Sequence, residues 1–207
     1  MIEFLEANSQ EMIQLTSEHL FLVGVSMGLA IVIGIPLGIL ITRIPQLSQP
    51  ILGIANLLQT IPSLALFGFL IPLPLIGGIG ERTAIVALTL YSLLPIIRNT
   101  YTGIRGVDPA IREAGQGMGM TDWQLLTQVE IPLAMGVILA GVRVATVIAV
   151  GLATIAAAIG AGGLGVFIFR GVATLNNSLL LAGAIPAALI ALIVDFILGI
   201  LERILSK

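Results

Sequence analysis

Long uncharged apolar runs alternate along this chain with short stretches that carry most of its charges. A helix needs about 20 apolar residues to cross a hydrocarbon core of about 30 Å. Runs of that kind are predicted as membrane spans at residues 20–42, 48–71, 82–104, 138–158 and 178–200. The pattern predicts an all-α integral membrane protein with about five transmembrane helices, in which residues 1–207 form a single membrane domain.

Prolines and glycines interrupt these runs and predict where the helices bend or stop. We expect the second span to bend near Pro62, because proline removes a backbone donor, and Pro95 interrupts the third. Residues 133–140 are predicted as an interfacial start that leads into the fourth span. The glycine-rich run at residues 160–165 has too little helix propensity to stay helical and predicts a turn.

Residues 1–19 carry four glutamates and neither lysine nor arginine. Their loosely spaced apolar residues favour a helix that lies on the membrane surface. A cleavable signal peptide is not expected, because the positively charged segment that begins such peptides is missing.

The longest polar segment between apolar runs extends from Asp108 to Pro132. Asp108 followed by Pro109 predicts a capped helix start, and glycines 115, 117 and 119 predict its end. Thr121 or Asp122 can cap a second helix that halts before Pro132. That second helix carries Trp123, Leu125 and Leu126, and Trp123 is expected to anchor it rather than to bind a cation.

Composition narrows the chemistry that the chain can perform. Hydrophobic residues make up 57% of the chain and charged residues 10%, and the mean hydropathy is +1.12, values typical of membrane proteins. Cysteine is absent and His19 is the one histidine, which excludes thiolate and paired-histidine metal sites. Lys207 is the one lysine, so no lysine-containing phosphate-binding loop is present. The net charge of −2, with no basic cluster, does not suggest nucleic acid binding.

The basic residues also predict the orientation of the spans. With five spans, one side of the membrane holds Arg43, Arg98, Arg105, Arg112, Arg203 and Lys207. The other side holds Arg82 and Arg170. The positive-inside rule then places the N-terminus outside, and the loop at residues 105–132 and the C-terminus in the cytoplasm.

At this loop the chain resembles a known family. Glu113-Ala114-Gly115, Gly119 and Val129-Glu130-Ile131-Pro132 are spaced like the Glu-Ala-Ala…Gly…Ile-x-Leu-Pro signature of ABC importer permease subunits. The departures are Gly115 in place of the second alanine, and Val129 and Ile131 in place of isoleucine and leucine. The resemblance implies the fold of a type I ABC importer permease with a cytoplasmic coupling helix.

Other strings resemble the osmoprotectant group of these permeases, which imports glycine betaine, choline, carnitine and similar compounds. They lie at residues 58–64, 94–103, 117–121 and 159–165. A methionine-type permease and a membrane scaffold that docks a cytoplasmic protein through the same loop are the alternatives.

The resemblance implies that the chain is not itself an enzyme and holds no cofactor. ATP and magnesium would bind to a cytoplasmic ABC ATPase dimer, which the loop would contact through Ile111, Glu113, Ala114, Gly119 and Pro132. The other implied partners are an extracytoplasmic solute-binding protein and a second permease copy or paralogue, in a bacterial or archaeal plasma membrane. From the residues alone, Ala110, Ile111, Ala114 and Met118 could serve as apolar anchors for a partner groove, with Arg112 and Glu113 at its rim.

Polar and proline residues within the spans are candidates for the translocation path or its gate, or for helix packing. They are Gln59, Thr60, Pro62, Ser63, Asn99 and Tyr101. The outer turn with Gly160, Gly162, Gly163 and Gly165 would be an outer gate, a contact for a solute-delivering protein, or a plain turn.

Arg143 and Asp195 are the ionisable residues expected within apolar spans. Both are placed toward the cytoplasmic ends of their spans, which favours side chains that snorkel to the interface over a pair across helices. Quaternary ammonium groups bind in aromatic cages, and with so few aromatic residues here we expect the complete cage in a separate binding protein.

Overall fold

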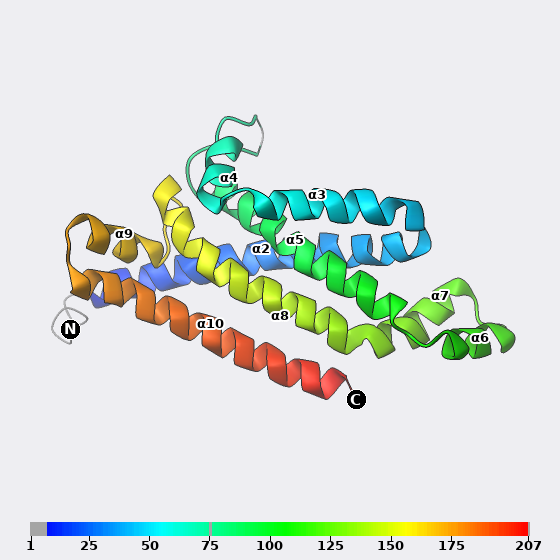
Figure 1. Cartoon of the computed structure of the whole chain (residues 1–207). Coiled ribbons are helices and arrows are strands. Elements are labelled where there is room, and N and C mark those ends of the chain that lie inside the picture. The colour runs from blue at the N-terminus through cyan, green and yellow to red at the C-terminus, as the bar shows by residue number, and fades with distance from the viewer. Residues whose placement is uncertain (1–7, 75, 207) are drawn as a thin grey trace.

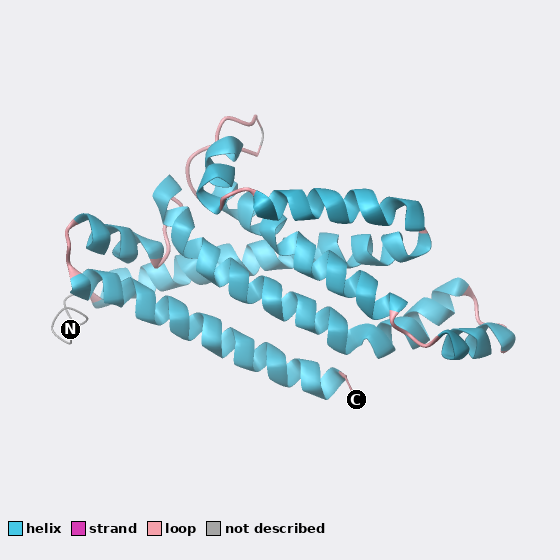
Figure 2. Ribbon diagram, viewed as in Figure 1, coloured by secondary structure: helices cyan, strands magenta, loops and turns pink. Residues whose placement is uncertain are grey.

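The computed structural model describes residues 8–74 and 76–206 as a bundle of helices, without strands in those residues (Figures 1 and 2). The predicted all-α membrane fold is confirmed. Residues 1–7 of the predicted interfacial segment, and Lys207 of the charge count, lie outside the described residues. The longer helices are α2 (Ser9–Arg43), α3 (Ser48–Thr60), α4 (Ser63–Leu70), α5 (Glu81–Arg105), α6 (Pro109–Gly117), α8 (Ile131–Ala156), α9 (Gly165–Ala173) and α10 (Asn177–Leu205).

The core of the bundle is formed by α2, α5 and α8, which pack along one another (Figure 1). Small residues line their contacts. A Cβ added at Gly38 of α2 would lie 2.5 Å from Cβ of Thr100, and one added at Gly141 of α8 would lie 2.5 Å from Cβ of Asn99. In lipid, helices associate through close packing of this kind because the hydrophobic effect does not drive apolar helices together.

The first helix is longer than the sequence pattern indicates. Residues 9–19 are the first turns of α2 and continue into the predicted first span without a break. The prediction of a separate interfacial helix is therefore wrong for these residues. Leu15 and His19 are buried against the rest of the bundle, which explains why this segment does not lie free on the membrane surface.

The second predicted span is broken rather than gently bent. The segment Pro45–Thr60 and helix α4 meet at an angle of 103°. Ile61, which precedes Pro62, has an extended backbone with φ −71° and ψ 127°, as the proline ring requires of its neighbour. The pair counts either as one broken span or as a re-entrant loop.

The helix that contains the fourth predicted span begins earlier than expected. From α7 (Asp122–Leu125) the chain passes through a π-helical turn, η2 (Leu126–Glu130), directly into α8. The second loop helix therefore does not halt before Pro132, and residues 133–140 are not a separate interfacial start. Pro132 is tolerated because it lies in the first turn of α8, where its missing N–H breaks no α-helical bond of that helix.

After α8 the glycine turn leads into α9, a short helix that the sequence pattern did not predict. Helix α10 then returns along α8. Among the described residues, four helices are long and apolar enough to cross a membrane, and the broken pair raises the number to five. The start of α2 and the end of α10 lie at opposite ends of the bundle (Figure 1). Helices α6 and α7 project from the end of the bundle at which α10 finishes.

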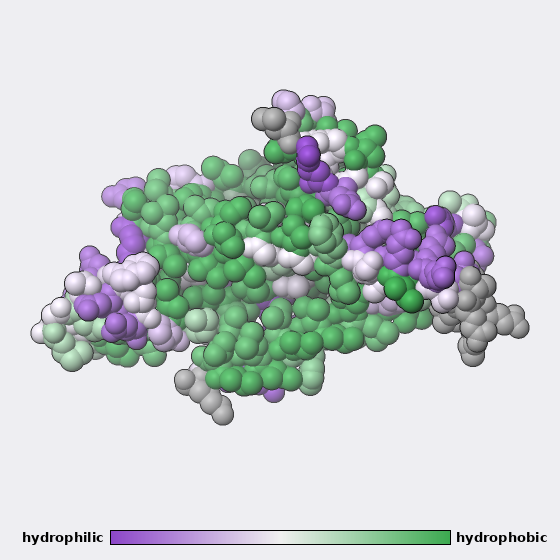
Figure 3. Space-filling model, turned by 180° about the vertical axis from the view of Figure 1, so that it is seen from behind, coloured by the Kyte–Doolittle hydropathy of each residue, from purple (hydrophilic) through white to green (hydrophobic). Residues whose placement is uncertain are grey.

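The surface has the distribution expected of a membrane protein. Apolar residues cover the middle of the face shown in Figure 3, and polar residues gather mainly toward its two ends. Helix α10 is mostly exposed along its apolar length, with Leu192 and Phe196 more than 60% exposed. An exposed apolar surface of this kind is expected to contact lipid or a partner subunit.

The close approach of α2 and α5 at Gly38 generates a stability prediction. We expect Gly38→Ala to destabilise the chain by about 1–3 kcal/mol, because the new methyl group overlaps Thr100 and the helices must separate. Gly24→Ala is the matched control, because Gly24 lies on the same helix and a Cβ there meets nothing within 4 Å. Thermal unfolding in detergent measures both variants, and equal midpoints would contradict the packing argument.

Candidate functional site

The loop between α5 and α8 is built by local capping chemistry. The Asp108 carboxylate accepts a hydrogen bond of 2.9 Å from the N–H of Ala110 and starts α6. Thr121 starts α7 through a capping box with Gln124. Gly119 joins the two helices at φ +84°, a left-handed conformation that favours glycine. The predicted helix–glycine–helix arrangement is therefore present.

Helix α6 packs closely on α7 at the position where the chain departs from the family signature. A Cβ on Gly115 would lie 2.9 Å from Cδ1 of Leu125 and 3.1 Å from Sδ of Met120. An alanine here would require the ends of the Leu125 and Met120 side chains to shift, so glycine fits this contact between the loop helices without rearrangement.

One face of α6 is open to a partner. Ile111 is 43% exposed and Met118 is 77% exposed, and Ala110, Glu113 and Ala114 are exposed as well. Apolar side chains that project from a polar loop in this way are typical of docking surfaces.

Arg112, expected at the rim of this docking face, points into the protein instead. Its guanidinium donates to the carbonyl oxygen of Ile104, and its Nε lies 3.2 Å from Oε1 of Glu130. The same carboxylate accepts from Arg43 at the end of α2, with Nη1 at 3.4 Å and a closer contact from Nη2. We call Arg43, Arg112 and Glu130 the Glu130 cluster.

The Glu130 cluster connects the loop to the bundle. Glu130 is 1% exposed, and a buried carboxylate is stable only when it is paired and hydrogen-bonded. Its two arginines come from α6 and from the end of α2, and it ends the π-helical turn before α8. These contacts and the hydrogen bond from Arg112 to Ile104 join α6 to the ends of α2 and α5 and to the turn before α8.

Glu130 is part of the family signature but is not among the coupling residues predicted from the sequence. The sequence signal for its role is weak: Glu130 is a single glutamate beside an apolar run, and its arginine partners are far away in sequence. Only the fold brings residues 43, 112 and 130 together.

A second set of contacts lies at the broken helix. Pro95 lacks an N–H, so the carbonyl of Tyr91 loses its helical partner, and Nε2 of Gln59 donates to that oxygen at 2.9 Å. In return the Tyr91 hydroxyl donates to the carbonyl of Ile61, at the break before Pro62. The free carbonyl within α5 and the Ile61 carbonyl at the break are therefore each satisfied by a side chain of the other segment, and Tyr91 is not among the predicted path residues.

The predicted path residues are only partly brought together. Gln59 and Asn99 line a common pocket of about 200 Å³ together with Leu94, Pro95, Arg98, Val144 and Ile148. Thr60 instead donates to Leu57 in its own helix. Ser63 and Tyr101 are partly exposed outside this pocket, and Pro62 is exposed at the break.

The glycine turn is held by the first helix. Gly160, Gly162 and Gly163 have φ between +74° and +79°, and the N–H of Gly163 donates to the Glu18 carboxylate at 3.0 Å. Gly163 and Gly165 are buried, which leaves Gly160 and Gly162 as the accessible members of the predicted outer turn. Arg170 of α9 pairs with Glu11 of α2 at 2.6 Å and strengthens the same junction.

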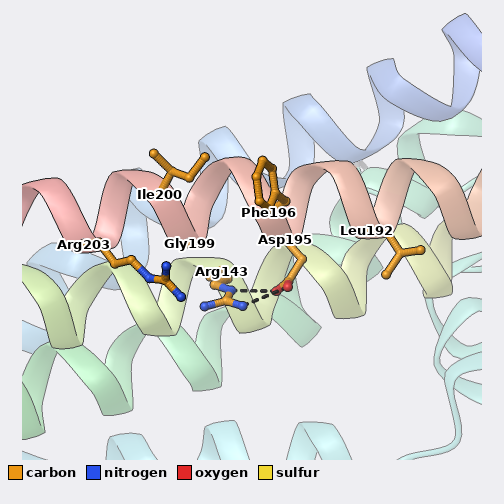
Figure 4. Close-up of a pocket in the computed structure, with 7 residues that line it drawn as sticks. All are labelled: Arg143, Leu192, Asp195, Phe196, Gly199, Ile200 and Arg203. Atoms are coloured by element: carbon orange, nitrogen blue, oxygen red, sulfur yellow. Dashed lines mark hydrogen bonds and ion pairs between the residues drawn. The ribbon is translucent and has the colours of Figure 1, made fainter.

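Arg143 and Asp195 form an ion pair across α8 and α10, as Figure 4 shows. Nε and Nη2 of Arg143 donate to the two carboxylate oxygens at 2.6 and 2.8 Å, and Nη1 approaches Glu202 at 3.4 Å. The favoured prediction, separate snorkelling side chains, is wrong. Gly199 lies beside the guanidinium, since a Cβ there would be 3.2 Å from Cζ of Arg143.

Within residues 8–74 and 76–206, no group of three or more His, Asp or Glu side chains could hold a metal ion. A loop face is exposed, a charged cluster connects the loop to the core, and the second span is broken before Pro62.

Comparison with known proteins gives a consistent result. Residues 8–207 match the family described as binding-protein-dependent transport system inner membrane component. The chain is 49% identical to the osmoprotectant import permease protein OsmW of Salmonella typhimurium strain LT2, covering 99% of this chain and 96% of that protein. It is 44% identical to the glycine betaine/carnitine/choline transport system permease protein OpuCB of Bacillus subtilis strain 168, over 98% and 92% of the two chains.

Among solved structures, a chain of the MetNI methionine ABC transporter in an inward-facing conformation superposes with a TM-score of 0.87. The superposition covers 98% of this chain and 99% of that chain at 24% identity. A likeness at this identity establishes the fold and no more.

The Glu130 cluster generates a prediction that separates it from the rest of the loop. We expect Glu130→Gln to lower the free energy of unfolding by about 2 kcal/mol or more, because two arginines then face a neutral amide. Glu113→Gln, on the exposed face of the same loop, should have almost no effect. Thermal unfolding of the two variants in detergent tests this, and equal losses would contradict it.

Proposed function

Because the chain belongs to the family of binding-protein-dependent transport system inner membrane components, we propose that it is the permease subunit of an ATP-driven importer of quaternary ammonium osmoprotectants. The observation that carries the proposal is the match along nearly the whole chain to permeases named for osmoprotectant, glycine betaine, carnitine and choline transport. Glycine betaine, choline and carnitine are the candidate solutes.

The energy for transport enters through the loop. The chain has no phosphate-binding loop, so ATP and magnesium bind to a partner, a cytoplasmic ATPase dimer. The exposed face of α6, with Ile111, Glu113 and Ala114, docks into that dimer. Closure of the dimer moves α6, and the Glu130 cluster passes the movement to the bundle.

The solute crosses between two permeases. One copy has few helices to enclose a polar path, and a two-fold pair with a second copy or a paralogue would place the path on the shared axis. The pocket at Gln59 and Asn99 would face this axis, and the reciprocal contacts of Gln59 and Tyr91 would break and reform as the path opens. Binding of ATP shifts the balance between inward-open and outward-open states.

The whole chain forms one membrane domain with its N-terminus outside and its loop and C-terminus in the cytoplasm. The arginines at the loop end support this orientation through the positive-inside rule. The glycine turn then faces outward, where Gly160 and Gly162 are accessible to a solute-binding protein that delivers its cargo.

Competition for uptake tests the solute class. In cells that express the chain with the ATPase and the binding protein encoded with it, we expect ATP-dependent uptake of labelled glycine betaine that unlabelled betaine, choline or carnitine reduces. Methionine should not compete. Competition by methionine alone would favour a methionine-type permease, and uptake equal to that of cells lacking the chain would favour a scaffold.

The left-handed glycine between α6 and α7 tests coupling. We expect Gly119→Val to lower uptake tenfold or more, because a β-branched residue strains φ +84° and tilts α6 (~1–2 kcal/mol of backbone strain). ATP hydrolysis by the complex should fall less than uptake. Gly117→Val is the matched control, since a Cβ there meets nothing within 4 Å and its φ is not positive. Equal uptake by the two variants would contradict the proposed role.

A further inference from the structure

An apolar groove of about 390 Å³ lies where the end of α2 meets the loop. Its walls are formed by α2, α7, η2 and the first residue of α8. It is lined by Pro36, Ile39, Leu40, Arg43, Trp123, Leu126 and Ile131. Neither the docking face of α6 nor the pocket at Gln59 includes any of these residues, and Arg43 is the one that also belongs to the Glu130 cluster.

The two ends of the groove differ in chemistry. Along α2 the walls toward the bundle are Pro36, Ile39 and Leu40, and Leu40 is 39% exposed. At the other end are Arg43, the last residue of α2, whose side chain is 38% exposed, and Trp123, which is 71% exposed. Tryptophan was predicted to anchor the second loop helix, but its ring faces outward. Exposed tryptophan and arginine at the end of a span are typical of the headgroup level of a membrane.

The charges at this end do not cancel. The Glu130 cluster combines two guanidinium groups with one carboxylate, and that carboxylate is buried. One positive charge remains, and Arg43 is the more exposed of the two arginines. Asp122, next to Trp123 on α7, is exposed but does not line the groove. An anionic group with hydrogen-bond acceptors therefore complements the mouth of the groove.

We propose that the groove binds an anionic phospholipid. One acyl chain lies along Pro36, Ile39 and Leu40, and the phosphate accepts hydrogen bonds from Arg43 beside the ring of Trp123. An aliphatic trough that ends in an arginine and a tryptophan fits this amphipathic shape, whereas a soluble anion would leave the trough empty. The bound lipid contacts α2, α7 and η2 together and so touches the elements that join the loop to the bundle.

The composition of the chain supplies a direct probe, because Trp123 is its one tryptophan. The full chain is reconstituted in phosphatidylcholine vesicles that contain brominated phosphatidylglycerol or, at equal mole fraction, brominated phosphatidylcholine. Bromine quenches tryptophan fluorescence on contact. We expect phosphatidylglycerol to bind about fivefold more strongly, the preference that one basic residue near the membrane surface provides. Unlabelled phosphatidylglycerol should relieve the quenching, and unlabelled phosphatidylcholine should not.

Two variants separate the groove from general lipid contact. Arg43→Gln should remove the preference for phosphatidylglycerol while both lipids still quench. A second protein, Trp123→Phe with Leu192→Trp, carries its tryptophan on exposed α10, away from the groove, and should show equal quenching by the two lipids.

Three results would overturn the proposal. Equal quenching of wild-type Trp123 by both lipids would indicate ordinary annular lipid. Quenching by neither lipid would indicate that a second copy of the chain covers the groove. A preference at Leu192→Trp as strong as at Trp123 would indicate that anionic lipid is enriched around the whole protein. Because the competition with unlabelled lipid uses the unaltered chain, it remains decisive if Arg43→Gln fails to fold.

Discussion

Within a membrane, a polar group that lacks a partner in the protein costs several kcal/mol, because water is not there to replace that partner. Much of this structure follows from that constraint. The second span is broken before Pro62, and Pro95 leaves the carbonyl of Tyr91 free within the continuous helix α5. Gln59 donates to that carbonyl, and Tyr91 donates to the carbonyl of Ile61 at the break. A buried glutamate is paired with two arginines. The same constraint explains why Arg143 and Asp195 meet rather than extend separately.

In the proposed transport cycle, these satisfied groups are where the molecule would change shape. The break before Pro62 is held by two side-chain hydrogen bonds, which would open as the path opens. The loop has the opposite property. Its helices are capped, Gly115 lies at their contact, and Glu130 pairs with Arg112 of α6 and with Arg43 at the end of α2. A stiff input and a breakable contact near the pocket are a suitable combination for an importer that is driven from one side of the membrane.

The groove at Trp123 adds the surrounding lipid to this arrangement. It lies against the same turn that carries Glu130, so an occupant of the groove and a partner of α6 would act on one set of contacts. Two ligands that favour different arrangements of a shared element influence each other's binding, whatever their distance apart. The lipid and the ATPase would then be coupled through Arg43.

The sequence by itself determined the all-α membrane class, the capped loop and the family, because hydrophobic runs, Asp108–Pro109, Thr121 and the spaced signature are local patterns. The resemblance to ABC importer permeases is confirmed by the family match. Only the tertiary structure decided which distant side chains meet. Arg43 and Glu130 are 87 positions apart and Arg143 and Asp195 are 52 apart, and such contacts depend on how the helices pack at glycines such as Gly38 and Gly199. The continuous α2, the π-helical turn before α8 and α9 were missed for the same reason. Their backbone is stabilised by burial against other helices, which a pattern read along one chain does not contain.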